Sequence, residues 1–394
     1  MIIMKAKHLL YLIILSISCK SKDNNLFKFD PRSLEENRIN LSEIADEINY
    51  IPLDNSIPLG VIYHNPKFIN NSMFLFANGI GILAFNEEGK VLRKIGSIGR
   101  GPGEYIYGYN YTVDETNGTI YVSDIGNIIK VYSKNGKFLR SFSIKECGNR
   151  IDAIEYFNFK IFASCAIQFE DAEYEWIVLD TLGNLIKKKE RRIPKFSSQR
   201  GGLEGTYKFE NKISYWNQFT DTIFSIQPDL SEKPSFIINP GDYRLPRSNV
   251  SLSLEQYSQY LKIEQIFETN RFLVVKYFFS KEKNAFVLII KENLKSFLTY
   301  LKPEESGVHM DYIGGIVNDI DGGSRFLPKS YYVRNGREYV FGLIYPYQVK
   351  ALVATSEFKK STPRYPEKKQ ELENLAARLK ETDNPILMIV RLKK

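Results

Sequence analysis

Cysteine, histidine and tryptophan are scarce in this chain. Its 394 residues include three cysteines, three histidines and two tryptophans. Multi-histidine metal sites and disulfide-rich scaffolds are therefore nearly excluded. The chain has no Cys-x-x-Cys, His-Glu-x-x-His or Gly-x-Ser-x-Gly motif, and no Gly-Lys-Ser/Thr follows its glycine-rich segment. These absences argue against zinc sites, an α/β-hydrolase nucleophile and a Walker loop.

Long hydrophobic runs are also missing, apart from one at the N-terminus. Lys5 and Lys7 precede the apolar run 9–17, which is the layout of a secretory signal. The run is too short for a transmembrane helix, which needs about 20 residues. Leu15-Ser16-Ile17-Ser18 before Cys19 resembles a bacterial lipobox, with Ser16 where leucine is usual. We expect residues 1–18 to be a signal peptide, Cys19 to be lipidated and residues 19–37 to be a flexible tether. An ordinary cleaved signal with an incidental cysteine is the alternative.

The positive charge of the chain is concentrated at its two ends. The formal net charge is +8, and removing residues 1–18 takes away two of these charges. Residues 359–394 hold ten Lys or Arg against five acids, which accounts for most of what remains. The short basic runs are not interleaved with stacking aromatics. We therefore expect no nucleic-acid partner, and membrane contact through a lipid anchor only.

With Cys19 expected to be lipidated, two cysteines remain free to pair. Cys147 and Cys165 could pair, because an oxidising compartment permits a disulfide. Cys165 lies in the apolar run 161–167, so a buried free thiol is the alternative. The sequence leaves this choice open.

Aromatic residues and an internal repeat are what the chain has in abundance. Its 53 Phe, Tyr and Trp residues make up 13% of the sequence, which favours strands. Residues 74–93 align without a gap to residues 121–140 at an offset of 47, and Gly183 follows Gly136 by the same interval. Looser strand clusters follow at 212–226, 270–294 and 334–347. Six clusters of this kind predict an all-β, six-bladed β-propeller over residues 38–394.

Both ends of the predicted propeller look like strands. The runs 38–53 and 384–392 are strand-like, and a propeller commonly closes its ring by pairing its two ends in one blade. Between the last cluster and the C-terminal strand, Leu372, Leu375, Ala376 and Leu379 have helical spacing. We predict one short helix over 366–381 that caps a blade edge.

Four short stretches resemble the six-bladed β-propeller lipoproteins of gut-type Gram-negative bacteria. They are the Gly-x-Gly-Pro-Gly-Glu-Tyr stretch within 94–105, and residues 41–45, 318–323 and 384–387. The resemblance covers essentially the whole mature chain. It implies the fold and export to the cell envelope, with a lipid anchor in the outer membrane, and it says little about activity.

The glycine-rich segment 99–105 demands tight, partly left-handed backbone. Its amides could form an anion-binding nest with Arg100 as counter-charge. The interpretation we favour is a structural corner in which Arg100 and Glu104 pair. The candidate binding residues of the chain are Arg100, Glu104, Tyr105, Asp124 and Arg325.

The aspartate-rich loop 317–323 resembles a calcium loop only in part. Asp319 and Asp321 supply two of the oxygens that such a loop needs, and no Glu stands at the twelfth position. A turn is favoured, so we expect neither a metal ion nor a cofactor. If His309 and Asp311 converge with these two aspartates, the four could form an acid–base cluster, and they are the catalytic candidates.

Two functional hypotheses follow. The first is a monomeric, exported binding or scaffolding propeller for a glycan, a peptide or a partner lipoprotein, motivated by the predicted fold and the absence of a catalytic constellation. The alternative is a propeller-type polysaccharide lyase or hydrolase that uses the four catalytic candidates.

Overall fold

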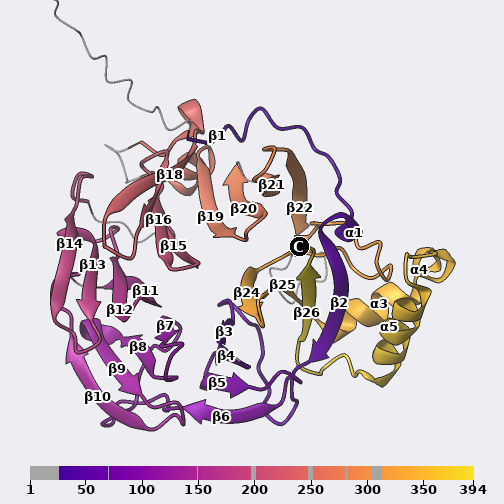
Figure 1. Ribbon diagram of the computed structural model, residues 1–394, viewed down its shortest axis with the longest axis horizontal. Helices are drawn as coiled ribbons and strands as arrows, with labels where there is room; N and C mark the ends of the chain where they lie inside the picture. Colours follow the sequence, from indigo (N-terminus) through magenta and orange to yellow (C-terminus); the bar gives the residue numbers. More distant parts are fainter. Residues whose placement is uncertain are drawn as a thin grey trace, which may run out of the picture.

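The computed structural model describes residues 26–69, 71–148, 150–196, 201–246, 252–279, 283–303 and 312–394. Cys19, His309 and Asp311 lie outside these residues, as does the predicted signal peptide. In the described part of the chain the strands form six sheets arranged in a ring (Figure 1). The predicted six-bladed β-propeller is confirmed.

The blades are numbered here in chain order by their innermost strand. Blade 1 contains β3 (Lys67–Ile69), β4 (Ser72–Ala77), β5 (Gly81–Phe85) and β6 (Val91–Ile95). Blade 2 contains β7 (Tyr111–Val113), β8 (Ile120–Asp124), β9 (Ile128–Tyr132) and β10 (Phe138–Ser143). Blade 3 contains β11 (Ile151–Phe157), β12 (Lys160–Cys165), β13 (Tyr174–Asp180) and β14 (Leu185–Glu190).

The other three blades include strands from distant parts of the chain. Blade 4 contains β15 (Glu204–Phe209), β16 (Lys212–Asn217), β17 (Thr222–Ile226), β18 (Glu232–Ile238) and β1 (Lys28–Phe29). Blade 5 contains β19 (Leu261–Glu268), β20 (Phe272–Phe279), β21 (Lys283–Ile290), β22 (Ser296–Pro303) and β23 (Tyr312–Ile313). Blade 6 contains β24 (Ser330–Arg334), β25 (Arg337–Ile344), β26 (Ile386–Leu392) and β2 (Ala45–Pro52).

The helices are few and short. The α-helices in the described residues are α1 (Leu41–Ile44), α2 (Leu254–Ser258), α3 (Pro346–Ala354), α4 (Ser356–Lys360) and α5 (Pro366–Arg378). Two 3₁₀ turns, η1 (Ile125–Asn127) and η2 (Gly241–Tyr243), complete the set. Of the helices described, none is both long enough and apolar enough to cross a membrane.

The repeated glycines of blades 1 and 2 are explained by contacts between blades. Gly89 and Gly136 sit in the hairpins before the outer strands, with φ of +78° and +82°. A Cβ on Gly89 would lie 2.5 Å from the carbonyl oxygen of Pro52 in blade 6, and one on Gly136 would strike the Lys94 carbonyl of blade 1. Each hairpin thus packs on the backbone of the preceding blade, which leaves no room for a side chain.

The ring closes through its two terminal strands, as predicted. β2 is the outer strand of blade 6 and pairs antiparallel with β26, with Ile48 opposite Val390. β26 in turn pairs with β25, where Val340 lies opposite the same Val390. The C-terminal strand is therefore held on both edges, which explains its continuous apolar sequence.

The predicted C-terminal helix is present as α5. Its residues Leu372, Leu375 and Ala376 are buried in the apolar core cluster that also contains Ile48 and Val390. α3 and α4, which the sequence analysis did not predict, lie beside α5 in the connection between β25 and β26 (Figure 1). The three helices form an insertion packed on the outer side of blade 6.

The ordered fold begins before the predicted boundary at residue 38. β1 adds to blade 4 in parallel register, with Lys28 opposite Ile237. Phe29 is buried in an apolar cluster of blades 4 and 5, and Asn37 exchanges hydrogen bonds with the backbone of Leu298. Residues 26–37, expected as part of a tether, run instead along the propeller because their aromatic side chains have apolar surface to cover.

Cys147 and Cys165 form a disulfide, with Cα atoms 4.8 Å apart. It joins the connection between blades 2 and 3 to the end of β12, inside an apolar cluster. Of the two alternatives that the sequence left open, the structure contains the disulfide.

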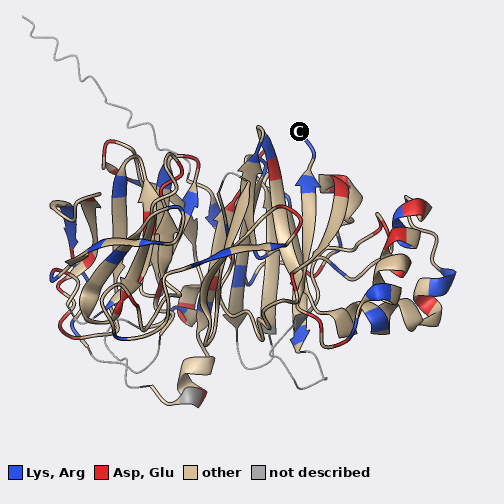
Figure 2. Cartoon of the chain, turned by 90° about the horizontal axis from the view of Figure 1, so that it is seen from below, with Lys and Arg blue, Asp and Glu red and all other residues tan. Residues whose placement is uncertain are grey.

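The two faces of the propeller differ. The strands nearest the axis are β3, β7, β11, β15, β19 and β24, and the chain enters all of them from one face, here called the loop face. The long connections between blades and the helical insertion gather toward this face, on the lower side of Figure 2. Tight hairpins and the C-terminus occupy the opposite face, here called the turn face (Figure 2).

Candidate functional site

A groove of about 1130 Å³ lies between the segment that precedes β24 and helices α3 and α4. The segment 314–329 forms one wall and the helical insertion forms the other. Apolar side chains contribute much of the lining, among them Leu327, Leu343, Leu352, Phe358 and Met388. Apolar linings with a few placed polar groups are typical of ligand sites.

Cationic side chains outnumber acids around this groove, which we call the arginine groove. Arg38, Arg325, Lys329 and Arg364 line it, against Asp319 and Glu357. None of the three arginines forms an ion pair with an acidic residue in the described part of the chain, and the Arg364 guanidinium donates a long hydrogen bond, 3.4 Å, to Ser42 Oγ. The groove therefore presents guanidinium groups that an anionic ligand could neutralise.

The Asp319 carboxylate is already occupied by protein donors. Its Oδ1 accepts a hydrogen bond of 2.9 Å from the Ser42 backbone N–H, and its Oδ2 accepts one of 2.5 Å from Ser42 Oγ. The neighbouring Val317 carbonyl accepts from the Leu41 N–H at 2.7 Å. Asp319 thus ties the groove wall to α1 and forms no ion pair with the three arginines.

Asp321 is fully buried and holds the loop in shape. Its Oδ1 accepts hydrogen bonds from Asn318 Nδ2 at 2.6 Å and from the Gly323 N–H at 2.7 Å. Burial raises the pKa of Asp321, and burial together with this carboxyl raises the pKa of Tyr50 well above its usual range. The Asp and Gly residues of 318–323 therefore form a turn that builds the groove wall.

The predicted acid–base cluster is only partly within the described chain. His309 and Asp311 lie outside it, so their convergence with Asp319 and Asp321 stays a prediction. Asp319 lines the arginine groove, whereas Asp321 borders a second cavity of about 990 Å³ between β2 and α5. Among the described residues, no group of three or more His, Cys, Asp and Glu side chains is placed to hold a metal ion.

The glycine-rich segment is a corner between blades 1 and 2. Glu104 folds back so that its Oε2 accepts from the Gly101 N–H at 2.8 Å and its Oε1 accepts from Ser97 Oγ at 3.2 Å. These bonds lower the pKa of Glu104. The Arg100 side chain is exposed to solvent beside it. The partners of Glu104 are thus backbone and hydroxyl groups of its own loop.

Tyr105 and Asp124 fasten this corner to the blades. The Tyr105 hydroxyl accepts from the Ile82 N–H at 2.9 Å and donates to the Ile95 carbonyl at 2.8 Å. Asp124 Oδ1 accepts from the backbone N–H groups of residues 106 and 107, and its Oδ2 lies 3.0 Å from Lys130 Nζ. Of the five predicted binding residues, Arg325 alone lines the arginine groove; the other four lie at this corner.

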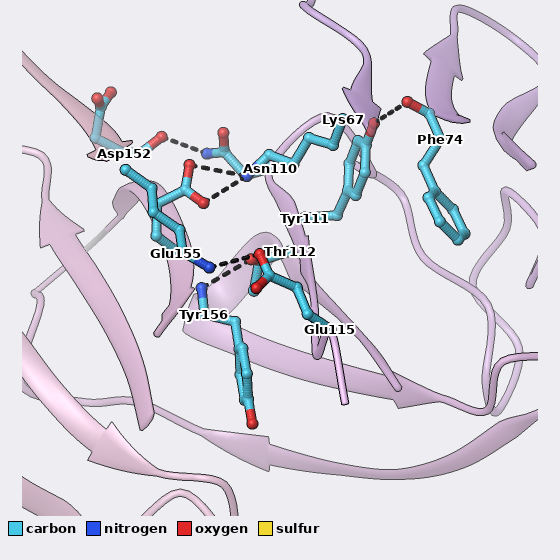
Figure 3. Close-up of polar contacts among 10 residues, drawn as sticks. Lys67, Phe74, Asn110, Tyr111, Thr112, Glu115, Asp152, Glu155 and Tyr156 are labelled. Carbon is cyan, nitrogen blue, oxygen red and sulfur yellow. Dashed lines mark hydrogen bonds and ion pairs between the residues drawn. The ribbon is translucent and has the colours of Figure 1, made fainter. Parts of the chain in front are cut away.

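Ion pairs near the centre of the propeller join blades that are not adjacent in the ring. Lys67 Nζ of blade 1 lies 2.8 Å from Glu155 Oε1 of blade 3, beside Asn110 and Asp152 (Figure 3). Lys208 Nζ of blade 4 lies 2.5 Å from Glu115 Oε1 in blade 2. Sequence reasoning missed these residues because the inner strands carry no repeated motif; lone polar residues within short strands were the available signal.

Comparison with known proteins identifies the family. A family model described as "Domain of unknown function (DUF4934)" matches residues 26–391. The chain belongs to the DUF4934 family. No curated protein matches it.

Two solved structures are similar to this DUF4934 chain. One, named "Putative exported protein" from Bacteroides fragilis, has a TM-score of 0.65 and 19% identity, covering 93% of this chain and 99% of its own. Another, a DUF4221 family member from Bacteroides vulgatus, has a TM-score of 0.49 and 10% identity, covering 89% and 97%. At 19% identity, the first of these shows a shared fold alone.

Proposed function

We propose that this protein is an exported, lipid-anchored binding propeller that captures an acidic peptide segment of a partner protein in the arginine groove. Export and anchoring are supported by the signal layout of residues 1–18 and by Cys19 after it. The Cys147–Cys165 disulfide suits an oxidising compartment outside the cytoplasm. The cell envelope of a Gram-negative bacterium, with the anchor in the outer membrane, is the location that fits these features.

The observation that carries the choice of ligand is the combination of arginines and apolar residues in one groove. Arg38, Arg325 and Arg364 have no acidic partner among the described residues, so an incoming carboxylate has guanidinium groups to pair with. The apolar lining provides area for the nonpolar side chains of a peptide. A neutral sugar would leave the guanidinium groups without a counter-charge, and the groove offers it two aromatic side chains, Tyr347 and Phe358, among the described lining residues.

A binding experiment with labelled peptides tests the proposal. Peptides of matched apolar content but different net charge are titrated with the mature protein, and fluorescence anisotropy is recorded. We expect acidic peptides to bind more tightly than neutral or basic ones, with an affinity that falls as salt rises. The Arg325→Glu/Arg364→Glu double variant should weaken this binding by about tenfold or more, because hydrogen bonds to charged groups contribute about 1.5–3 kcal/mol each.

A matched control uses Arg337, the first residue of β25, whereas the groove is lined by Leu343 and Ile344 at the end of that strand. Arg337→Glu changes the net charge of the protein in the same direction but away from the groove, so it should leave binding within about twofold of wild type. Equal losses in the groove and control variants would show a general charge effect and contradict the proposal. So would an absence of any preference for acidic peptides.

A further inference from the structure

A second cluster of side chains lies on the loop face, away from the arginine groove. Its members are in, or just before, the inner strands of blades 2, 3 and 4, and they are Tyr107, Tyr109, Arg150, Asp152 and Glu204. The arginine groove belongs to blade 6 and its insertion. The two places therefore share no residue.

The aromatic part of this cluster is a supported, exposed ring. Tyr107 is 51% exposed, although its ring centroid lies only 5.9 Å from that of Tyr109. Tyr109 stacks on His64 at 4.9 Å with an interplanar angle of 10°, and Phe76 packs against both rings. Because Tyr109 is held by these neighbours, Tyr107 rests on a fixed support and offers its ring to solvent.

The polar part has both donors and acceptors. Arg150 Nη2 donates to the Tyr109 hydroxyl at 2.8 Å and the rest of this exposed guanidinium is open to other acceptors. Asn110 Nδ2 donates to the backbone carbonyl of Asp152 at 2.5 Å, and the Asp152 carboxylate points away from that amide (Figure 3). Arg150 and Asp152 thus bring a cation and an acid to the edge of the aromatic support.

Two acceptors beside this cluster have no hydrogen-bond partner in the described residues. Glu204 Oε1 accepts from the Ile167 N–H at 3.2 Å, but its buried Oε2 accepts from nothing. Gln168, the residue after Ile167, is 3% exposed and its Oε1 is likewise unsatisfied. A buried acceptor without a donor costs about 1–3 kcal/mol, and both of these oxygen atoms are enclosed by the protein, so they lie behind the surface that a ligand would touch.

The two carboxyl groups also affect each other. Burial raises the pKa of Asp152 to about 6, and burial together with the negative charge of Asp152 raises the pKa of Glu204 well above its usual range. Both shifts favour a protonated carboxyl within the pair. Such a pair can donate a hydrogen bond and accept others in the same place.

We propose that Tyr107, Tyr109 and Arg150, with the carboxyl pair Asp152 and Glu204, form a second binding site that takes a sugar ring of a neutral oligosaccharide. A pyranose has an apolar C–H face that packs on an aromatic ring, and hydroxyl groups that both donate and accept hydrogen bonds. A cationic ligand suits the cluster less well, because Arg150 and Arg191 already lie close enough to Glu204 for their charges to act on it. An anionic ligand would meet both carboxyl groups.

The test is a titration of the mature protein with a panel of neutral gluco-, manno-, galacto- and xylo-oligosaccharides, followed by calorimetry. At least one of these should bind, and Tyr107→Ala should weaken it by about tenfold, equivalent to about 1.4 kcal/mol. Arg150→Gln should weaken it as well, through the polar half of the site. Both side chains are exposed, so the variants are expected to melt within a few degrees of wild type.

The matched control is Phe159→Ala. Phe159 is 67% exposed, and it lies in the turn between β11 and β12 on the turn face of blade 3. This variant should bind the oligosaccharide as wild type does. The proposal is overturned if no neutral oligosaccharide binds, or if Phe159→Ala and Tyr107→Ala weaken binding equally.

The result for oligosaccharide binding can also be distinguished from the result for acidic-peptide binding in the arginine groove. Arg325→Glu/Arg364→Glu should leave oligosaccharide binding unchanged, and Tyr107→Ala should leave acidic peptide binding unchanged. Loss of both activities in either variant would show that the two regions are not independent sites and would contradict the assignment of a second site.

Discussion

Among single residues, Tyr105 shows how a buried hydroxyl can hold two strands. Its side chain is fully buried, and its hydroxyl bridges the Ile82 N–H of β5 and the Ile95 carbonyl of β6. We predict that Tyr105→Phe lowers the free energy of unfolding by about 1–3 kcal/mol, because both backbone groups lose a partner in a dry environment. Urea denaturation followed by tyrosine or tryptophan fluorescence measures the change.

Tyr107→Phe is the natural control for that variant. Tyr107 is two residues away and 51% exposed, so water can take the place of its hydroxyl and the free energy of unfolding should change by less than about 0.5 kcal/mol. If the two substitutions destabilise the protein equally, the bridging role of Tyr105 is wrong.

The same residues show why site prediction from sequence goes only part of the way. Residue type identified Glu104, Tyr105 and Asp124 as capable of binding, but it could not reveal that their polar atoms meet protein donors and acceptors. Tyr107 and Tyr109 lie only a few residues after Tyr105, but the sequence did not single them out as binding residues. What distinguishes them is exposure and stacking on His64, which depends on how loops of neighbouring blades meet.

Between elements, the disulfide is the clearest cross-link. It closes a loop of 18 residues between the entry to blade 3 and the end of β12. Closing a loop of this size restricts the unfolded chain by about 3 kcal/mol. We therefore predict that Cys147→Ala/Cys165→Ala lowers the free energy of unfolding by about 2–4 kcal/mol, measured by urea denaturation.

Reduction of the wild-type protein provides an independent check on that value. Both sulfur-bearing side chains are fully buried, so reductant should act only once the protein opens. In urea with reductant, the wild-type midpoint should approach that of the double variant. An unchanged midpoint after confirmed reduction would show that the cross-link adds no stability.

Elements were predictable where the chain repeats itself. Blades 1 and 2 follow from the alignment of 74–93 with 121–140, since glycine turns and alternating apolar residues recur at fixed spacing. The insertion in blade 6 was partly missed for a physical reason. The cluster 334–347 was interpreted as strand to its end, whereas Pro346 begins α3. Proline at the first helical position is a start signal, but here only Tyr345 separates it from the end of β25.

For the whole molecule, the proposed anchor makes a prediction about location. If Cys19 is lipidated, the protein should fractionate with the outer membrane, and Cys19→Ala should move it to the soluble envelope fraction or leave its signal uncleaved. Immunoblots of fractionated cells and mass spectrometry of the mature N-terminus check this. A wild-type protein that is already soluble, with no acyl group on Cys19, would contradict the anchor but leave the groove proposal intact.

The path of the N-terminal segment also determines which contacts would break first if force were applied to the proposed lipid anchor. From β1 on blade 4 it passes Leu298 of blade 5 and reaches Val317 and α1 before it becomes β2. Tension applied at the lipid would first peel the short β1 pairing from β18, then the contacts along blade 5. The pairing of β2 with β26 would be the last of these contacts to bear the force. If Cys19 carries a lipid, the β1 and blade 5 contacts would break before the β2–β26 pairing that closes the ring.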